Sequence, residues 1–225
     1  MAIADSTSSA GAPVTVKSER GDIRAIFHHT AGNAAAAIFV GGFDGGFDGP
    51  ADAIFAHLGT SLLEYGISSL RLDYRLHTSP GVVEEAVYDV INGVNYLKEV
   101  GVAKVALVGH SFGGAVVIDA AAQSPEVATV VALSSQTYGT RNVAKISPRP
   151  LLLIHGQDDQ RLPPSCSEYI YARAQEPKEL IILPGARHSL GQKREEVFRL
   201  IVGWLVDKIG FSGSQGKLLA KGETN

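Results

Sequence analysis

The chain has 225 residues, of which 45% are hydrophobic and 19% charged, and its formal net charge is −3. This length and balance are typical of one globular domain, which needs neither a disulfide nor a metal to hold its core. So small a net charge gives no long-range attraction to nucleic acid or anionic lipid, and we expect neither as a partner.

The ends of the chain and its single cysteine, Cys166, bear on where the protein works. One cysteine excludes an intramolecular disulfide and is compatible with a reducing compartment. The start lacks the cationic and apolar regions of a secretory signal, and no apolar run approaches the ~20 residues that span a bilayer. We expect a soluble, cytoplasmic protein with no membrane partner. Polar, small-residue composition predicts disorder over 1–13 and 211–225, with a single domain over 14–210.

The first half of the chain predicts two short strands followed by strand–helix units. Short apolar runs indicate strands, whereas apolar residues that repeat every three or four positions indicate helices. In chain order these patterns predict strands at 14–18, 22–28 and 35–40, a helix at 51–65, a strand at 67–74 and a helix at 83–97.

The second half continues this alternation with more apolar strands. In chain order it predicts a strand at 105–108, a helix at 112–123, strands at 127–133, 151–154 and 180–183, and a helix at 195–209. Continuously apolar strands that alternate with helices predict a mostly parallel, eight-stranded α/β sheet with helices on both faces. Active residues of such sheets gather in the turns at the carboxyl ends of the strands.

The turn after the strand at 105–108 reads Gly109-His110-Ser111-Phe112-Gly113. The G-x-S-x-G pattern is weakly specific alone, but here it lies between a buried strand and a buried helix, as a nucleophile elbow requires. Glycines on either side of the serine remove side chains that would clash in so tight a turn. We therefore predict Ser111 as a nucleophile; a glycine-cushioned turn without chemistry is the alternative.

A serine hydroxyl needs a base to become a nucleophile, and His188 is the predicted base. It is the one histidine among seven that stands in the turn after the last predicted strand. The acid that orients this histidine is expected after the strand at 151–154, where Asp158 and Asp159 are adjacent. Adjacent side chains diverge, so one aspartate faces His188 and the other is a turn residue. Spacing alone does not choose between them.

The chain order Ser, Asp, His resembles that of the α/β-hydrolases, and the resemblance covers about residues 14–209. The family's acid turn usually reads H-G-x-x-D-x-x-x-P, matched here by His155, Gly156, Asp159 and Pro163. The resemblance therefore favours Asp159 as the acid. The family's histidine turn often reads G-x-x-H, matched here by Gly185 and His188.

The resemblance also implies an oxyanion hole made of two backbone N–H groups, those of Phe43 and Phe112. Many relatives begin the first of these loops with His-Gly, whereas this chain has Gly41-Gly42. The layout is similar to that of the dienelactone hydrolases, which are close in size and have no cap. Those enzymes use Cys where this chain has Ser111, so the resemblance to them is one of layout.

The short connection 134–149 leaves no room for a large cap domain and predicts an open cleft. We expect aromatic and apolar residues to line it, namely Phe43, Phe47, Tyr74, Phe112, Tyr138 and Leu190. Arg71, Asp73 and Arg75 alternate along one predicted strand, which favours a mutual ion pair. The alternative is that Arg75 binds an anionic group of the substrate.

These features predict a serine hydrolase, carboxylesterase-like, that cleaves a small-to-medium carboxylic ester or thioester through an acyl-enzyme. No cofactor and no metal is expected, because dinucleotide, phosphate-loop and calcium-loop patterns are missing. Two alternatives stay open: a non-catalytic small-molecule receptor or scaffold on the same fold, and an acyltransferase or peptidase.

Overall fold

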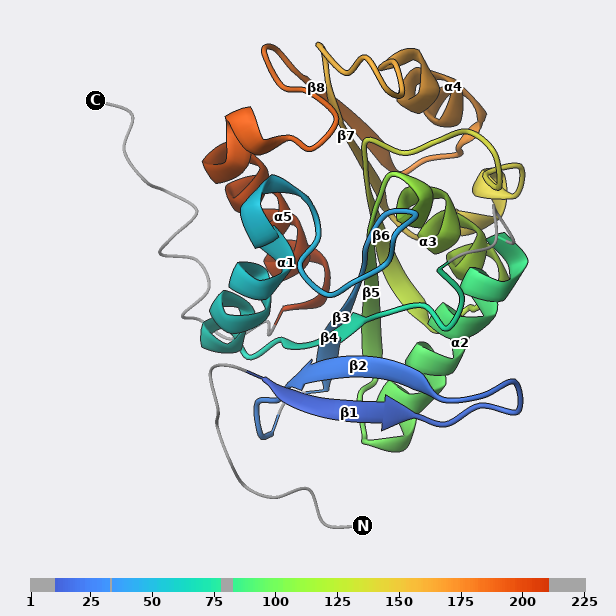
Figure 1. Ribbon diagram of the computed structural model, residues 1–225, viewed down its shortest axis with the longest axis vertical. Helices are drawn as coiled ribbons and strands as arrows, with labels where there is room; N and C mark the ends of the chain where they lie inside the picture. The colour runs from blue at the N-terminus through green and yellow to red at the C-terminus, as the bar shows by residue number, and fades with distance from the viewer. Residues whose placement is uncertain (1–10, 33, 78–82, 211–225) are drawn as a thin grey trace.

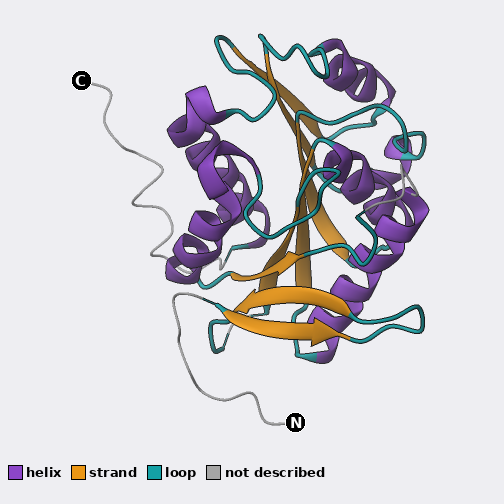
Figure 2. Cartoon of the chain, viewed as in Figure 1, coloured by secondary structure: helices purple, strands orange, loops and turns teal. Residues whose placement is uncertain are grey.

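The computed structural model describes residues 11–32, 34–77 and 83–210, which form one eight-stranded sheet with helices on both faces (Figure 2). The disorder predicted for 1–13 and 211–225 falls almost entirely outside these residues. The predicted end of the N-terminal disordered segment, residue 13, was wrong. Ala12 and Pro13 belong to the first strand and pair with the second. No helix among the described residues has the length and apolarity needed to cross a membrane.

The strands lie in the order β1-β2-β4-β3-β5-β6-β7-β8. Their bounds are β1 Ala12–Val16, β2 Ile23–His28, β3 Ala35–Val40, β4 Ser68–Leu72, β5 Lys104–His110, β6 Val127–Leu133, β7 Leu151–Gly156 and β8 Lys178–Leu183. The pairs β1–β2 and β2–β4 are antiparallel, and every other neighbouring pair is parallel. The predicted mostly parallel α/β sheet is thus confirmed.

Helices cover both faces of the sheet (Figure 1). On the first face lie α1 (Pro50–Ser61) and α5 (Arg194–Ile209), and on the second lie α2 (Val83–Glu99), α3 (Phe112–Gln123) and α4 (Ser165–Arg173). Short 3₁₀ turns follow α1 and precede α5. A third, η2 (Val143–Ile146), is the only helical turn between β6 and β7. No large cap therefore covers the described part of the chain.

The apolar strands form two core layers because successive side chains of a strand point to opposite faces. On β5, Leu107 packs in the layer beneath α2 and α3, whereas Val108 packs in the layer beneath α1 and α5. All six residues of β3 are buried. Burial on both faces is the reason that these strands read as unbroken apolar runs.

Strand register brings the carboxyl ends of the parallel strands to one edge of the sheet. Val40 at the end of β3 pairs with Leu72 of β4 on one side and with Gly109 of β5 on the other. Further along, Leu133 of β6 pairs with His110. The loops that follow these strands therefore start side by side, as the sequence predicts.

Candidate active site

Ser111 occupies a strained turn between β5 and α3, with φ 57° and ψ −114°. Such a backbone is unfavourable for a residue with a side chain and persists only where its surroundings hold it. A Cβ on Gly109 would lie 2.1 Å from the carbonyl oxygen of Gly113, and one on Gly113 would lie 2.3 Å from that of Gly41. The two glycines of the motif are therefore required by close backbone approach.

His188, in the loop after β8, lies between Ser111 and Asp159. Its Nε2 is 3.0 Å from the Oγ of Ser111, and its Nδ1 is 2.7 Å from Oδ2 of Asp159. Because Nδ1 faces a carboxylate, Nδ1 carries the proton of the neutral imidazole and Nε2 is free to accept one from the serine. The structure thus brings together three side chains that are far apart in the sequence.

Asp159, and not its neighbour Asp158, faces the imidazole. Asp159 is 5% exposed, and its Oδ1 accepts hydrogen bonds from the backbone N–H groups of Arg161 and Leu162, each at 2.9 Å. Asp158 is exposed to solvent. Burial acts to raise the pKa of Asp159, but the hydrogen bonds from Leu162, His188 and Arg161 outweigh it and lower the pKa. The carboxylate is therefore held in its charged form.

A second buried imidazole, that of His155 on β7, also contacts Asp159. Its Nε2 lies 2.9 Å from the carbonyl oxygen of Leu162 and 3.2 Å from Oδ2 of Asp159, and its Nδ1 lies 2.7 Å from the Oγ of Ser167. Burial lowers the pKa of His155, which favours the neutral ring. With two acceptors at Nε2, the proton resides there and the Ser167 hydroxyl donates to Nδ1. No spacing in the sequence indicates Ser167, because α4 was not predicted.

His110, the residue before the serine, supports the loop that carries His188. Its Nε2 donates to the backbone carbonyl of His188 at 3.0 Å, and the two rings have centroids 4.9 Å apart. Burial lowers the pKa of His110 to about 4, so the ring is neutral near pH 7.

The glycine-rich loop after β3 lies beside the nucleophile turn. A Cβ on Gly42 would be 3.7 Å from the Cβ of Ser111, and the ring of Phe43 packs edge-on against that of Phe112 with centroids 6.0 Å apart. The segments that carry the two backbone N–H groups expected in the oxyanion hole therefore meet next to the serine. Their role in holding an oxyanion stays a prediction.

The six residues expected to line the cleft do not all line one pocket. Phe43, Tyr74 and Phe112 line one small pocket together with Leu76. Tyr138 is 65% exposed, and Phe47 is half-buried beneath the guanidinium of Arg24, at 5.9 Å from the ring centroid. Neither is among the lining residues of that pocket.

The prediction that Leu190 lines the cleft was wrong. Leu190 is fully buried in the core layer formed with α1 and α5. Its backbone lies in the left-handed region, with φ 59°, directly before the short 3₁₀ turn that precedes α5. The sequence places Leu190 two residues after His188, but it does not indicate whether the side chain of Leu190 faces the cleft or the core.

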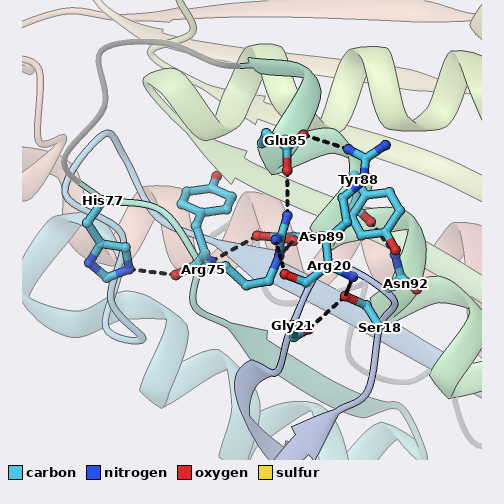
Figure 3. Close-up of polar contacts among 10 residues, drawn as sticks. Ser18, Arg20, Gly21, Arg75, His77, Glu85, Tyr88, Asp89 and Asn92 are labelled. Atoms are coloured by element: carbon cyan, nitrogen blue, oxygen red, sulfur yellow. Dashed lines mark hydrogen bonds and ion pairs between the residues drawn. The ribbon is translucent and has the colours of Figure 1, made fainter.

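The alternative role of Arg75 as an anion-binding residue was also wrong. Figure 3 shows its guanidinium between α2 and the turn before β2. It donates to Asp89 and to Glu85, the latter at 2.7 Å, and also to the carbonyl oxygen of Arg20 at 2.8 Å. The side chain is 9% exposed. Its donors are thus already engaged in a structural ion-pair network.

The predicted mutual ion pair among Arg71, Asp73 and Arg75 is absent from the described contacts. Asp73 pairs with Arg24 of β2, whereas Arg71 contacts His28 of β2 and Asp48 of the glycine-rich loop. The physical reason is that β4 ends at Leu72. Beyond that residue the two-residue alternation of a strand no longer governs where side chains point, so each group pairs with a neighbouring segment instead.

Comparisons with known proteins agree with this architecture. The sequence model of the dienelactone hydrolase family matches residues 73–203. The uncharacterized protein YfhR of Escherichia coli (strain K12) is 28% identical over 169 residues, which cover 61% of this chain and 60% of YfhR. An uncharacterized protein of Mycobacterium tuberculosis is 27% identical over 194 residues, which cover 72% of this chain and 66% of that protein. The chain thus spans less than two thirds of these relatives.

Solved structures resemble this one in fold at low sequence identity. A dienelactone hydrolase from Anabaena variabilis superposes with a TM-score of 0.77 at 19% identity, covering 88% of this chain and 98% of that one. Est1E from Butyrivibrio proteoclasticus gives a TM-score of 0.76 at 18% identity, covering 89% and 99%. The α/β-hydrolase GrgF from Penicillium gives 0.73 at 18% identity, covering 88% and 98%. The α/β-hydrolase fold expected from the sequence is confirmed.

Proposed function

We propose, from the premise that this chain belongs to the dienelactone hydrolase family of α/β-hydrolases, that it is a serine hydrolase acting on carboxylic esters or thioesters. Membership of the family supports hydrolase chemistry, and the serine mechanism and the ester substrate go beyond it. One observation carries it. The Oγ of Ser111, the imidazole of His188 and the carboxylate of Asp159 form a continuous hydrogen-bonded series, with distances of 3.0 and 2.7 Å.

In the proposed first half-reaction, Ser111 Oγ attacks the substrate carbonyl carbon while Nε2 of His188 takes the hydroxyl proton. Asp159 stabilises the imidazolium that forms. The backbone N–H groups of Phe43 and Phe112 donate to the oxyanion of the tetrahedral intermediate. The intermediate then collapses, the bond to the leaving group breaks, and His188 returns the proton to the departing alcohol or thiol.

The second half-reaction regenerates the enzyme with the same groups. Water gives a proton to His188 as its oxygen attacks the acyl-enzyme carbonyl, and the new tetrahedral intermediate releases the carboxylic acid as Ser111 recovers its proton. The reaction needs no cofactor. A serine at position 111 makes the base essential, since an alcohol, unlike a thiol, is scarcely ionised at neutral pH.

The substrate class is tested with a panel of esters and thioesters of increasing acyl length, using Ser111→Ala as control. A structure of the fold relative Est1E contains ferulic acid, so an aromatic ester belongs in the panel. Wild type should turn over at least one class, and Ser111→Ala should lose activity on the order of 10⁴-fold or more. Equal rates for the two proteins would contradict the proposed nucleophile.

Labelling by a serine-directed phosphonate distinguishes the proposal from a non-catalytic receptor on this fold. The wild type should be labelled at one site and Ser111→Ala should not be labelled. A protein that binds esters without turnover and without labelling would instead be a receptor. Competition by added alcohols or amines for the acyl group would identify an acyltransferase.

A further inference from the structure

Two residues that directly follow β4 hold the part of the glycine-rich loop around Phe43, whereas Arg71 of β4 contacts the loop further on, at Asp48. The loop runs from Gly41 to Gly49 and contains Phe43, whose N–H is the proposed first oxyanion donor. Glycine-rich segments lose much conformational freedom on ordering, so a donor on such a loop needs contacts that hold it in place. On either side of Phe43 such hydrogen bonds come from Asp73 and Tyr74, the residues just after β4.

Asp73 binds the later part of the loop. It is 1% exposed, and its Oδ1 accepts a hydrogen bond from the backbone N–H of Gly46 at 2.7 Å. The same oxygen lies 2.8 Å from Nε2 of His77, while Oδ2 pairs with Arg24. A Cβ on Gly45, which has φ +66°, would lie 2.5 Å from Oδ1. The carboxylate therefore packs directly against this backbone.

Tyr74 binds the beginning of the loop. Its buried hydroxyl donates to the carbonyl oxygen of Gly41 at 3.1 Å. That same oxygen is the atom nearest to a Cβ built on Gly113 of the nucleophile turn, at 2.3 Å. Gly41 is thus enclosed between Tyr74 and the start of α3. The contacts of Tyr74 and Asp73 thus fall on Gly41 and Gly46, on either side of Phe43.

We infer that Asp73 and Tyr74 are positioning residues that hold the oxyanion loop, and with it the N–H of Phe43, in its working geometry. This inference rests on the proposed serine hydrolase function. Backbone donors stabilise a transition state well only when they are oriented before the charge develops. Loosening the loop should therefore lower kcat, while KM for the ester changes little.

A purely structural ion pair between Asp73 and Arg24 is the competing explanation. The Arg24 side chain is 70% exposed, and ion pairs with a solvent-exposed partner contribute little to stability. The hydrogen bond from the N–H of Gly46, in contrast, is accepted by a carboxylate that is almost fully buried. The two explanations differ in what an asparagine at this position would do, since its amide oxygen can accept from Gly46 without any charge.

The test compares Asp73→Ala, Asp73→Asn, Tyr74→Phe and Arg24→Ala by kcat and KM on the best ester of the panel. Asp73→Ala should lower kcat about 10-fold or more, bounded by the ~10²- to 10³-fold lost with a whole oxyanion donor. Tyr74→Phe should lower kcat by a smaller factor. Asp73→Asn and Arg24→Ala should stay within about threefold of wild type, and the KM of all four should stay within that range.

Inhibition by a trifluoromethyl ketone, which forms a tetrahedral adduct with the serine, gives a second readout. Its affinity should fall in parallel with kcat for Asp73→Ala and Tyr74→Phe. Wild-type kcat in Asp73→Ala, or equal losses in Asp73→Asn, Arg24→Ala and Asp73→Ala, would overturn the inference. If Asp73→Ala does not fold, an unchanged kcat in Tyr74→Phe would overturn it.

The serine hydrolase activity and the positioning role of Asp73 and Tyr74 are tested separately. If wild type is not labelled by the phosphonate and Ser111→Ala keeps its activity, the proposed function is wrong. If wild type is labelled and active but the loop variants leave kcat and ketone affinity unchanged, only the role of Asp73 and Tyr74 is wrong.

Discussion

The chemistry of single residues in this site depends on which atoms face the carboxylate of Asp159. Its Oδ2 lies near both His188 and His155, and its Oδ1 accepts from two backbone N–H groups. A buried carboxylate with this many donors stays ionised, and its charge selects the tautomer of His188 that leaves Nε2 free for the serine. The surroundings of Asp159 thus determine both its charge and the tautomer of His188.

Asp159→Asn should therefore lower kcat on the order of 10⁴-fold without unfolding the protein. The amide can still accept from the backbone, but its N–H₂ group favours the tautomer of His188 that cannot take the serine proton. Steady-state kinetics on an ester measure the effect. The matched control is Asp158→Asn at the exposed neighbour, which should behave like wild type; equal losses in both variants would contradict the assignment.

His110 should make the free energy of unfolding depend on pH below neutrality. Its pKa is lowered, by burial first, from 6.5 to about 4 in the folded protein. Between these values the unfolded chain binds the proton and the folded one does not, so stability falls as pH decreases. The change corresponds to about 3 kcal/mol and is complete below the folded pKa.

Urea unfolding at pH 7 and pH 4.5 would measure this dependence. The comparison is with His110→Gln, which cannot titrate there and should lose less stability over the same interval. Identical losses in the two proteins would mean that His110 is not the group responsible. His155, whose pKa is also lowered, adds a dependence of the same sign to both proteins.

At the scale of elements, the candidate active site is assembled by close packing of three backbones. The end of β3, the nucleophile turn and the start of α3 approach so closely that Gly113 faces the carbonyl oxygens of Gly41 and Val40, at 2.3 and 2.8 Å from a would-be Cβ. No side chain fits between these segments. The end of β3 and the start of α3 therefore fix where the glycine-rich loop begins, although the glycines of that loop would allow many backbone conformations.

Gly113→Ala should destabilise the fold by about 1–3 kcal/mol and reduce activity, because the methyl group forces α3 away from the loop. Gly203→Ala on α5 is the matched control. Nothing lies within 4 Å of a Cβ there, so the substitution should stabilise the helix by about 0.4–1 kcal/mol. Denaturant unfolding and ester kinetics together separate the two effects, and equal stability changes would refute the packing argument.

The helix α4 illustrates why elements differ in how well they can be predicted. Only Ser167 and Ile170 of this helix are buried. A segment with so narrow an apolar face carries no clear periodicity, whereas α2 buries eight residues at helical spacing and was predicted. The position of α4 matters nonetheless, because it brings Ser167 to His155.

For the whole molecule, two apolar layers on either side of one sheet hold the site in place. Leu107, at the centre of β5, is fully buried, whereas Leu76 beside the site is 50% exposed. Leu107→Ala should cost about 2–5 kcal/mol of stability, since the cavity lies among packed neighbours. Leu76→Ala should change stability by less than about 0.5 kcal/mol. Chemical denaturation of both variants checks the contrast.

The sequence by itself determined the alternation of strands and helices, the glycine-flanked turn that carries Ser111, and the edge of the sheet where His188 and the two adjacent aspartates lie. These features are local: apolar periodicity, a glycine motif and its neighbours are written within short stretches of chain. The choice of Asp159 from the sequence rested on resemblance, because adjacent aspartates are equivalent by spacing.

Only the tertiary structure decided which of those side chains meet. It turned Asp159 toward His188, engaged Arg75 with α2, buried Leu190 and placed Asp73 against the glycine-rich loop. Each outcome depends on how segments distant in sequence pack together. A change in the backbone direction of a single residue would give its side chain a different partner. Contacts of this kind leave no periodic signature in the chain, because they are fixed by the positions of whole elements.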